Sequence, residues 1–239
     1  MSDMLSNRVV LITGAAGALG SAVTRAFAAS GARLALAGTS LAELEALIES
    51  VDLPVARAFP MAADLTREDD VAALVEAVAG RFGPVDVLAN VVGGWSGGVP
   101  LHEMAVSAWD HALDLNLRTA FLISRAVLPG MLAAGWGRII HTSSKAAVAP
   151  RAKQAGYAVA KMGVIALTEA IAEEVKGTGV TANVVLPSII DTPANRRAMP
   201  KADPGKWVPA EHIAAVMTFL CSDAAASING TRVPVYGAV

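Results

Sequence analysis

The sequence predicts a single α/β domain of 239 residues with a Rossmann-type, doubly wound parallel sheet. Short runs rich in Val, Ile and Leu alternate with longer segments of helical periodicity along the chain. Several of these runs are apolar throughout, which is typical of parallel strands covered on both faces. A glycine-rich turn follows the first run, as in dinucleotide-binding folds. We therefore expect about seven parallel strands flanked by helices on both faces.

The expected elements follow one another as strand and helix. Strands are expected at residues 9–13, 33–37, 55–62, 85–92, 138–143, 181–186 and 232–236. Helices are expected at residues 19–29, 41–50, 67–81, 107–134, 156–176 and 210–222. Two capping boxes support helix starts: Ser40 with Glu43 for the second helix, and Thr66 with Asp69 for the third. Residues 187–209 follow no periodic pattern, and loops of that length are often functional lids.

Composition excludes several classes of protein. The chain is 54% hydrophobic and 17% charged with a net charge of −2, which suits a globular protein with one large core. This charge balance gives no reason to expect nucleic acid or an anionic membrane as a partner. The single cysteine, Cys221, cannot form an internal disulfide, which indicates a reducing compartment and a cytoplasmic location. Residues 1–8 contain no apolar run typical of a signal peptide, and no segment has the ~20 uninterrupted apolar residues of a membrane span.

The stretch from Thr13 to Gly20 is the expected phosphate-binding turn. Its three glycines permit a tight turn, close approach of the backbone to a pyrophosphate, and close packing of helix on strand. The N-terminus of the following helix offers free N–H groups to the phosphates. A plain strand-to-helix turn is the alternative interpretation. The expected cofactor contacts in this turn are Gly14, Gly17, Leu19 and Gly20.

The end of the second strand bears on the choice of cofactor. An acidic residue there would accept hydrogen bonds from the ribose of NAD, and a basic residue would suit the 2′-phosphate of NADP. The sequence has neither, but the hydroxyls of Thr39 and Ser40 could bind a phosphate. We therefore favour NADP(H), with NAD(H) possible. Asp64, followed by Leu65, could accept from the adenine amino group, although capping near Thr66 explains the aspartate equally well.

Tyr157 and Lys161 are candidates for acid–base chemistry. Four residues apart, they share one face of the expected helix. A free tyrosine, with a pKa of about 10, is a poor acid or base near neutrality, and a nearby positive charge lowers that pKa. Such a phenol could pass a proton to or from an alcohol or carbonyl oxygen. The pair by itself is a weak motif, because this spacing also occurs by chance.

With these residues in place, the chain from Val9 onward resembles the short-chain dehydrogenase/reductase family. Gly14 and Gly20 match the family's glycine motif, whereas its middle glycine is displaced to Gly17. Asn90 and Gly93 are what remains of the family's NNAG motif. The segment from Pro187 to Thr192 matches the family's PGxIxT motif, with Ser188 in place of glycine. The resemblance implies cofactor contacts from Asn90, Gly93, Tyr157, Lys161, Pro187, Ile190 and Thr192.

The resemblance also implies a catalytic set of Asn116, Ser144, Tyr157 and Lys161. Ser144 would position the substrate oxygen, and Tyr157 would donate or accept the proton during hydride transfer. Lys161 would bind the ribose hydroxyls and lower the pKa of Tyr157. Asn116 would hold a water of the proton relay. Ser144 lies thirteen residues before Tyr157, a spacing that favours it over the neighbouring Ser143, although a serine at a strand end can also simply satisfy backbone groups.

Residues 93–98 and 186–209 also resemble dihydropteridine reductases, divergent members of the same superfamily. Trp95 would offer a flat apolar face to a planar ring such as a pterin or quinone, or could be a core or interface tryptophan. We expect substrate contacts from Trp95, Ser144 and Tyr157. Animal dihydropteridine reductases lack the serine present here at 144 and carry an acid after the second strand, where this chain has Gly38 and Thr39.

These features favour an NAD(P)-dependent oxidoreductase that interconverts a carbonyl and a secondary alcohol. A dihydropteridine or quinone reductase is the alternative, and a non-catalytic nucleotide-binding regulator on the same fold is a third reading. We expect a lid at 193–209, a small-molecule substrate and no metal. By family resemblance, the apolar helix faces at 113–128 and 159–171 would form a homotetramer or homodimer.

Overall fold

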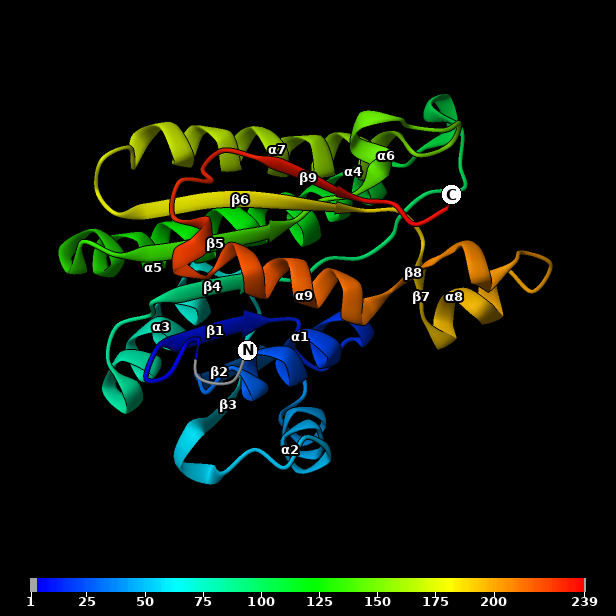
Figure 1. The fold of residues 1–239 in the computed structure, drawn as a ribbon. Coiled ribbons are helices and arrows are strands. Elements are labelled where there is room, and N and C mark those ends of the chain that lie inside the picture. Colours follow the sequence, from blue (N-terminus) through cyan, green and yellow to red (C-terminus); the bar gives the residue numbers. More distant parts are fainter. Residues whose placement is uncertain (1–3, 239) are drawn as a thin grey trace.

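A computed structural model describes residues 4–238 of the chain. Seven parallel strands form one sheet in the order β3-β2-β1-β4-β5-β6-β9, which confirms the predicted fold class (Figure 1). A second, two-stranded sheet pairs β7 (Ile190–Asp191) with β8 (Val208–Pro209). The strands of the large sheet are β1 (Val9–Thr13), β2 (Arg33–Gly38), β3 (Ala58–Ala62), β4 (Val87–Asn90), β5 (Gly137–Thr142), β6 (Val180–Pro187) and β9 (Arg232–Val235).

Helices cover both faces of the sheet. The helices are α1 (Ala18–Ala29), α2 (Leu41–Ser50), α3 (Glu68–Phe82), α4 (Val106–Leu113), α5 (Thr119–Ala134), α6 (Lys145–Val148), α7 (Ala155–Glu174), α8 (Pro193–Ala198) and α9 (Ala210–Leu220). On one face, α1, α2 and α9 bury a core that includes Phe27, Leu44 and Met217. On the other face, α3, α5 and α7 bury a core that includes Leu74 and Ile123. The central strands β1, β5 and β6 are buried at every position, as expected for a sheet covered on both faces.

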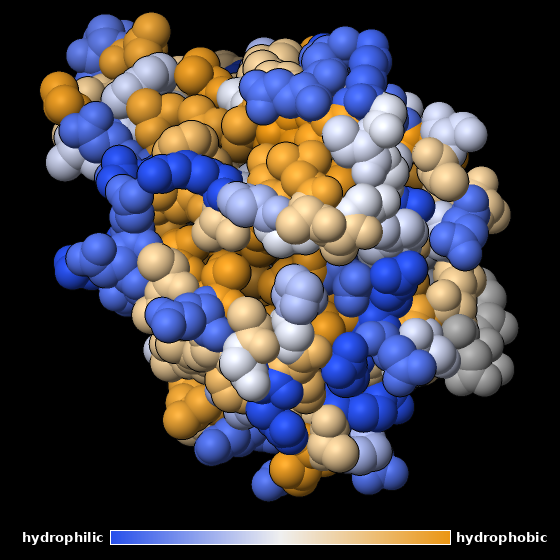
Figure 2. Space-filling view, turned by 90° about the vertical axis from the view of Figure 1, so that its left-hand side faces the viewer, coloured by the Kyte–Doolittle hydropathy of each residue, from blue (hydrophilic) through white to orange (hydrophobic). Residues whose placement is uncertain are grey.

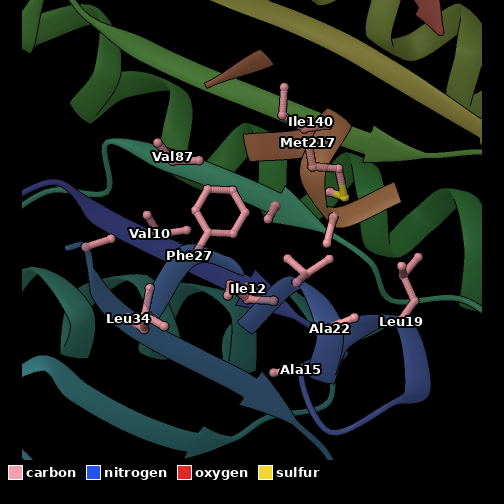
Figure 3. Close-up of a cluster of buried hydrophobic side chains, with 14 of the residues drawn as sticks. Val10, Ile12, Ala15, Leu19, Ala22, Phe27, Leu34, Val87, Ile140 and Met217 are labelled. Atoms are coloured by element: carbon pink, nitrogen blue, oxygen red, sulfur yellow. The ribbon is translucent and has the colours of Figure 1, made fainter. Parts of the chain in front are cut away.

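The first core fixes α1 against the sheet. Figure 3 shows Phe27 of α1 beside Val10 of β1, and Met217 of α9 beside Ile140 of β5. All four side chains are fully buried. Because α1 begins at the glycine turn, this packing also fixes the position of that turn.

The strand order reverses between β1 and β4, and such a switch point opens a crevice at the carboxyl ends of the strands. Thr13 and Asn90 are paired in register at these ends. The Thr13 hydroxyl donates to Asn90 Oδ1 at 2.6 Å and accepts from the backbone N–H groups of Val91 and Val92 at 3.1 and 3.3 Å. This one buried hydroxyl therefore fixes the exit of β4 beside the glycine turn. Figure 2 views the opposite end of the sheet, where hydrophobic and hydrophilic side chains are interspersed.

Two predictions around the third strand and third helix are corrected by the structure. The start of the predicted strand 55–62 is a short 3₁₀ helix, η1 (Val55–Arg57). The capping box at Thr66 and Asp69 is wrong, because α3 begins after Arg67 without a side-chain cap. The Thr66 hydroxyl donates instead to Asp64 Oδ1 at 2.7 Å. Ser40 caps α2 as predicted, accepting from the N–H of Glu43.

The predicted helix 107–134 is interrupted, and the predicted irregular segment 187–209 is structured. A π-helical turn, η3 (Asp114–Arg118), separates α4 from α5. Such turns inside α-helices are rare and concentrate at functional sites. Residues 187–209 contain β7, α8, a 3₁₀ turn η4 (Pro204–Lys206) and β8. Pairing between β7 and β8 holds the two ends of this segment together. No local sequence pattern predicts this contact.

Two helical stretches, Val106–Ala134 and Ala155–Glu174, are long and apolar enough to cross a membrane by length and composition alone. Core helices pass the same test, and 39% and 50% of their most apolar windows are buried inside the fold. Both stretches pack against the sheet through the second core or its neighbours. The prediction about a leader at residues 1–8 falls partly on residues 1–3, and the predicted domain includes residue 239; these lie outside the described residues.

Candidate active site

A pocket of about 340 Å³ opens at the carboxyl ends of the central strands. Four parts of the chain form its walls: the glycine turn, the segment after β4, the end of β5 with the start of α7, and the end of β6. This is the crevice expected at the switch point of a doubly wound sheet. The predicted residues in its walls are Gly14, Gly17, Leu19, Gly20, Gly93, Trp95, Ser144, Tyr157, Lys161, Pro187 and Ile190.

The glycine turn has no room for side chains. Gly14 has a φ of 64°, and a Cβ there would lie 3.0 Å from the backbone of Val92. A Cβ at Gly20 would lie 2.1 Å from the carbonyl oxygen of Gly14. Helix α1 then begins after Gly17 without a side-chain cap. An open backbone surface that leads into an uncapped helix N-terminus fits the pyrophosphate of a dinucleotide.

Asn116 lies in the π-helical turn η3 and is buried. Its Nδ2 donates to the carbonyl oxygens of Gly94 and Ala112 at 3.1 and 3.0 Å, and its Oδ1 accepts from the N–H of Gly94 at 3.1 Å. A Cβ at Gly93, which has a φ of 152°, would lie 2.7 Å from Asn116 Oδ1 and 2.8 Å from Lys161 Nζ. The glycine therefore lets the amide and the ammonium approach the same stretch of backbone.

Ser144 and Ser143 have different roles in the structure. Ser143 Oγ donates to the carbonyl oxygen of Lys161 at 2.7 Å, which uses its only proton. Ser144 caps α6 by accepting from the N–H of Ala146 at 3.1 Å, and it hydrogen-bonds the phenol of Tyr157. The structure thus brings Ser144 to the tyrosine and commits Ser143 to backbone.

The ionisation of Tyr157 differs from the sequence-based expectation. Burial raises the pKa of Tyr157 above its ordinary value, and the hydrogen bond from Ser144 lowers it by less. Lys161 Nζ lies 6.0 Å from the centre of the tyrosine ring and donates instead to the carbonyl oxygen of Thr142 at 3.0 Å. The expectation of a lowered pKa for Tyr157 is therefore wrong, because desolvation outweighs the hydrogen bond from Ser144.

Lys161 itself is almost fully buried, and burial lowers its pKa from 10.5 to about 8. Removal of the ammonium from water disfavours its charged form. The carbonyl of Thr142 is the partner that holds this ammonium in place. The lysine can thus exchange a proton much nearer neutrality than a lysine in solution can.

Trp95 stands at the rim of the pocket beside Tyr157. The two rings meet edge to face with centres 5.1 Å apart, and 61% of the tryptophan remains exposed. A Cβ at Gly97 would lie 2.7 Å from the indole and 2.8 Å from the carbonyl oxygen of Lys153. The glycine therefore provides the surface on which the indole rests.

Other predicted cofactor residues lie outside the pocket walls: Thr39, Ser40, Asp64, Leu65, Asn90 and Thr192. Ser40 Oγ caps α2, and Asp64 accepts from the backbone N–H and the hydroxyl of Thr66. The backbone bond from Ala63 N–H to the Gly38 carbonyl keeps both segments on the same sheet edge. Asn90 Oδ1 accepts from the Thr13 hydroxyl, and Thr192 caps α8 by accepting from the N–H of Asn195.

The pocket also contains residues that sequence reasoning missed. Val91, Val92 and Gly94 follow β4, and Ser188 follows β6, so their nearness to recognised motifs was the only signal available. Thr142 precedes the predicted serine by two positions, which places it on the strand end rather than in a motif. Only the folded sheet shows that these positions face the crevice.

Comparisons with known proteins agree with this geometry. The family model for "short chain dehydrogenase" matches residues 8–203. The chain is 35% identical to D-threitol dehydrogenase of Mycolicibacterium smegmatis, with 98% of this chain and 93% of the relative covered. It is 30% identical to 3-oxoacyl-[acyl-carrier-protein] reductase of Thermotoga maritima, with 98% of each covered. Its structure matches that of levodione reductase with a TM-score of 0.90 at 34% identity, covering 98% of this chain and 97% of the other.

The buried Lys161 ammonium makes stability depend on pH. Between pH 8 and 10 the folded protein binds fewer protons at Lys161 than the unfolded chain does, so the free energy of unfolding should rise with pH. Between pH 8 and 10, we expect the free energy of unfolding of the wild type to rise by about 2 kcal/mol relative to that of Lys161→Met. Urea unfolding at several pH values measures the difference.

The exposed Lys176 provides the matched control. The Lys176→Met variant removes a lysine of the same size from the surface and should follow the wild-type profile. If the free energies of unfolding of wild type and Lys161→Met changed equally with pH, burial would not lower the pKa of Lys161.

Proposed function

The chain belongs to the short-chain dehydrogenase/reductase family, and on this premise we propose that Asn116, Ser144, Tyr157 and Lys161 form its catalytic site. Members of this family are oxidoreductases that use NAD(H) or NADP(H), and the chain interconverts a carbonyl and an alcohol. The observation that carries our proposal is the hydrogen bond between Ser144 and Tyr157 in a pocket that also contains Lys161.

The residues of the pocket would divide the chemistry among them. A bound nicotinamide cofactor supplies or receives the hydride, and the protein supplies orientation and proton transfer. In the direction of reduction, Ser144 Oγ donates to the substrate carbonyl oxygen and orients it. As hydride reaches the carbonyl carbon, the proton of the Tyr157 hydroxyl moves to that oxygen, and the two together make the secondary alcohol. In the direction of oxidation, the same proton returns to Tyr157.

The raised pKa of Tyr157 suits it to donate a proton at neutral pH, because its phenol is fully protonated there. After donation, the tyrosinate needs nearby positive charge. Lys161 is the cation nearest to it within the pocket walls and would also bind the ribose hydroxyls of the cofactor. Asn116 would act through the backbone of Gly94 and hold the water that connects Lys161 to solvent.

NADP(H) is the proposed preference, with NAD(H) possible. Gly38 ends β2, and no carboxylate follows it that would repel a 2′-phosphate. Thr39 is exposed and could donate its hydroxyl to a phosphate oxygen. Asp64 would accept from the adenine with the oxygen that Thr66 leaves free. Because these segments continue the sheet edge beyond the glycine turn, an extended dinucleotide could reach them.

A small carbonyl or alcohol compound is the proposed substrate, with contacts from Trp95, Ser144 and Tyr157. The relatives are named for threitol, 3-oxoacyl and levodione substrates, so they do not favour a pterin or quinone for this chain. The exposed surface of Trp95 would bind the apolar part of the substrate.

Replacement of Trp95 by alanine should therefore raise KM more than it lowers kcat; an unchanged KM would contradict this role.

The segment 193–209 would act as a lid within one catalytic domain. Its two ends are joined where β7 pairs with β8, and Arg196 binds Asp191 through two hydrogen bonds at its base. Buried Trp207 fastens the return of the segment to the fold. The part between these anchors, from α8 to η4, could therefore move as a unit over the pocket.

Self-association through α5 and α7 is proposed from their exposed apolar side chains. Phe121 of α5 and Val159 and Met162 of α7 are 46%, 48% and 39% exposed. Two copies that pair these helices would bury these side chains and form a homodimer, and a second pairing would form a homotetramer. A cytoplasmic location is proposed from the single cysteine, Cys221, which is buried and forms no disulfide.

Loss of the Tyr157 hydroxyl should abolish turnover but not cofactor binding. We expect Tyr157→Phe to lower kcat by about 10²- to 10⁴-fold on ketones and diketones, because the proton donor is lost. NADPH affinity, measured by fluorescence titration, should stay nearly unchanged. Tyr236→Phe changes the only other tyrosine and should remain active. Normal turnover by Tyr157→Phe would disprove the proposed proton donor.

A carboxylate at position 38 should shift preference toward NADH. A Cβ at Gly38 would be 3.4 Å from Leu44 Cδ2, which is ordinary contact, so Gly38→Asp should fold. Repulsion of a 2′-phosphate should lower the ratio of kcat/KM for NADPH over NADH by about tenfold or more. Gly80→Asp adds the same charge at an open position of α3 and should leave the ratio unchanged. An unchanged ratio in Gly38→Asp would mean that the ribose pocket lies elsewhere.

A charge in the proposed helix interface should separate the subunits. Light scattering should give the mass of two or four copies for the wild type and a smaller assembly for Val159→Glu, because burying an unpaired charge is costly. Val55→Glu places the same charge at an 81% exposed position of η1 and should assemble normally. A monomeric wild type would rule out this interface.

A further inference from the structure

Three threonine hydroxyls in the described part of the chain are buried without a hydrogen-bond partner: those of Thr24, Thr142 and Thr181. Most buried polar groups in native proteins have a partner, and a hydroxyl that lacks one destabilises the fold. Of the three, only Thr142 lines the pocket. Its unpaired state therefore coincides with the place where a ligand would bind.

Thr142 ends β5 on the face of the sheet that carries α1 and α9. Side chains alternate along a strand, so Thr142 shares a face with Ile140, which packs in the core beneath α1 and α9. His141 points to the other face, where it contacts Ser124 and Thr168. The Thr142 hydroxyl therefore lies on the side of the glycine turn, while the Thr142 carbonyl accepts from Lys161 Nζ at 3.0 Å.

The surrounding chain offers this hydroxyl no side-chain partner. Leu19, Pro187 and Ile190 contribute to the same pocket and have side chains without hydrogen-bonding atoms. Val185, the register partner of Thr142 on β6, is also apolar. Thr192, which family resemblance implies as a cofactor contact, caps α8 outside the pocket walls. The hydroxyl of Ser188, between Pro187 and Ile190, donates to the carbonyl oxygen of Tyr236 at 2.5 Å. Thr142 therefore carries the hydroxyl without a partner in this part of the wall.

We propose that Thr142 Oγ1 is a binding group for the nicotinamide carboxamide of the bound cofactor. This inference rests on the proposed function, which places the reacting end of the cofactor beside Ser144, Tyr157 and Lys161. Thr142 belongs to the same strand end, two residues before Ser144. A carboxamide has both a donor and an acceptor, and either can pair with a hydroxyl. Binding would then give this hydroxyl a partner, which no described residue of the protein provides.

The test removes only the hydroxyl. Valine has the shape of threonine, so Thr142→Val deletes the hydrogen bond with little change in volume. Thr181→Val is the matched control, because Thr181 also has a buried unpaired hydroxyl but lies outside the pocket. Thr142→Ser keeps a hydroxyl at the same place. Each protein is titrated with NADPH, NADH and ADP-ribose, which lacks the nicotinamide, and its unfolding is measured without ligand.

We expect Thr142→Val to bind NADPH and NADH about tenfold more weakly than the wild type and to bind ADP-ribose equally well. Its stability without ligand should be equal or higher, since an unpaired buried hydroxyl is gone. Thr142→Ser should bind all three probes within about twofold of the wild type, a difference well below that of one lost hydrogen bond. Thr181→Val should gain or keep stability with unchanged binding of every probe.

Two results would overturn the proposal while leaving the proposed function intact: equal NADPH and NADH binding by wild type and Thr142→Val, or an equal loss of ADP-ribose binding in Thr142→Val. The first would mean that the hydroxyl has no cofactor partner, and the second that its partner lies outside the nicotinamide. Failure of the wild type to bind either dinucleotide would instead remove the proposed function, and this inference with it.

Discussion

The hydroxyl of Thr13 holds together the junction on which the pocket depends. With one proton and two lone pairs it ties β1 to Asn90 and to the two backbone N–H groups that follow β4. The glycine turn leaves β1 at that residue, and the segment toward Trp95 leaves β4 beside it. A Cβ at Gly14 would touch the backbone of Val92, so the two segments can lie this close only because residue 14 is a glycine. The crevice at the switch point has its shape from this contact.

Burial of polar groups gives the site its chemical character. Lys161 and Tyr157 both lie largely out of water. Burial lowers the pKa of Lys161 and raises the pKa of Tyr157, and both shifts favour the neutral form. The Thr142 carbonyl, the Ser144 hydroxyl and the nearby Asn116 amide supply the fixed dipoles that water would supply outside. A site of this kind needs little reorganisation when charge develops during the reaction. Its cost is a desolvated ammonium at Lys161 and an unpaired hydroxyl at Thr142.

The π-helical turn that contains Asn116 shows how the fold serves the site. A regular α-helix bonds each N–H to the carbonyl four residues earlier, whereas a π-helical turn reaches five residues back. The wider turn at 114–118 lets Asn116 bond both its helix, at Ala112, and the segment after β4, at Gly94. Gly93 keeps space between this amide and Lys161. Helix, loop and lysine are thus fixed relative to one another through one side chain.

By resemblance to the family, the sequence pointed to Ser144, Tyr157 and Lys161 as a group. By itself it determined the alternation of strands and helices, the parallel sheet and the glycine turn. These follow from local periodicity, glycine placement and spacing, which are written along the chain. Only the tertiary structure decided that Ser143 turns to backbone, that burial raises the pKa of Tyr157, and that residues 187–209 are ordered by pairing of β7 with β8. It alone also revealed the unpaired hydroxyl of Thr142. Desolvation and long-range pairing depend on what packs around a residue, and no local pattern contains that information.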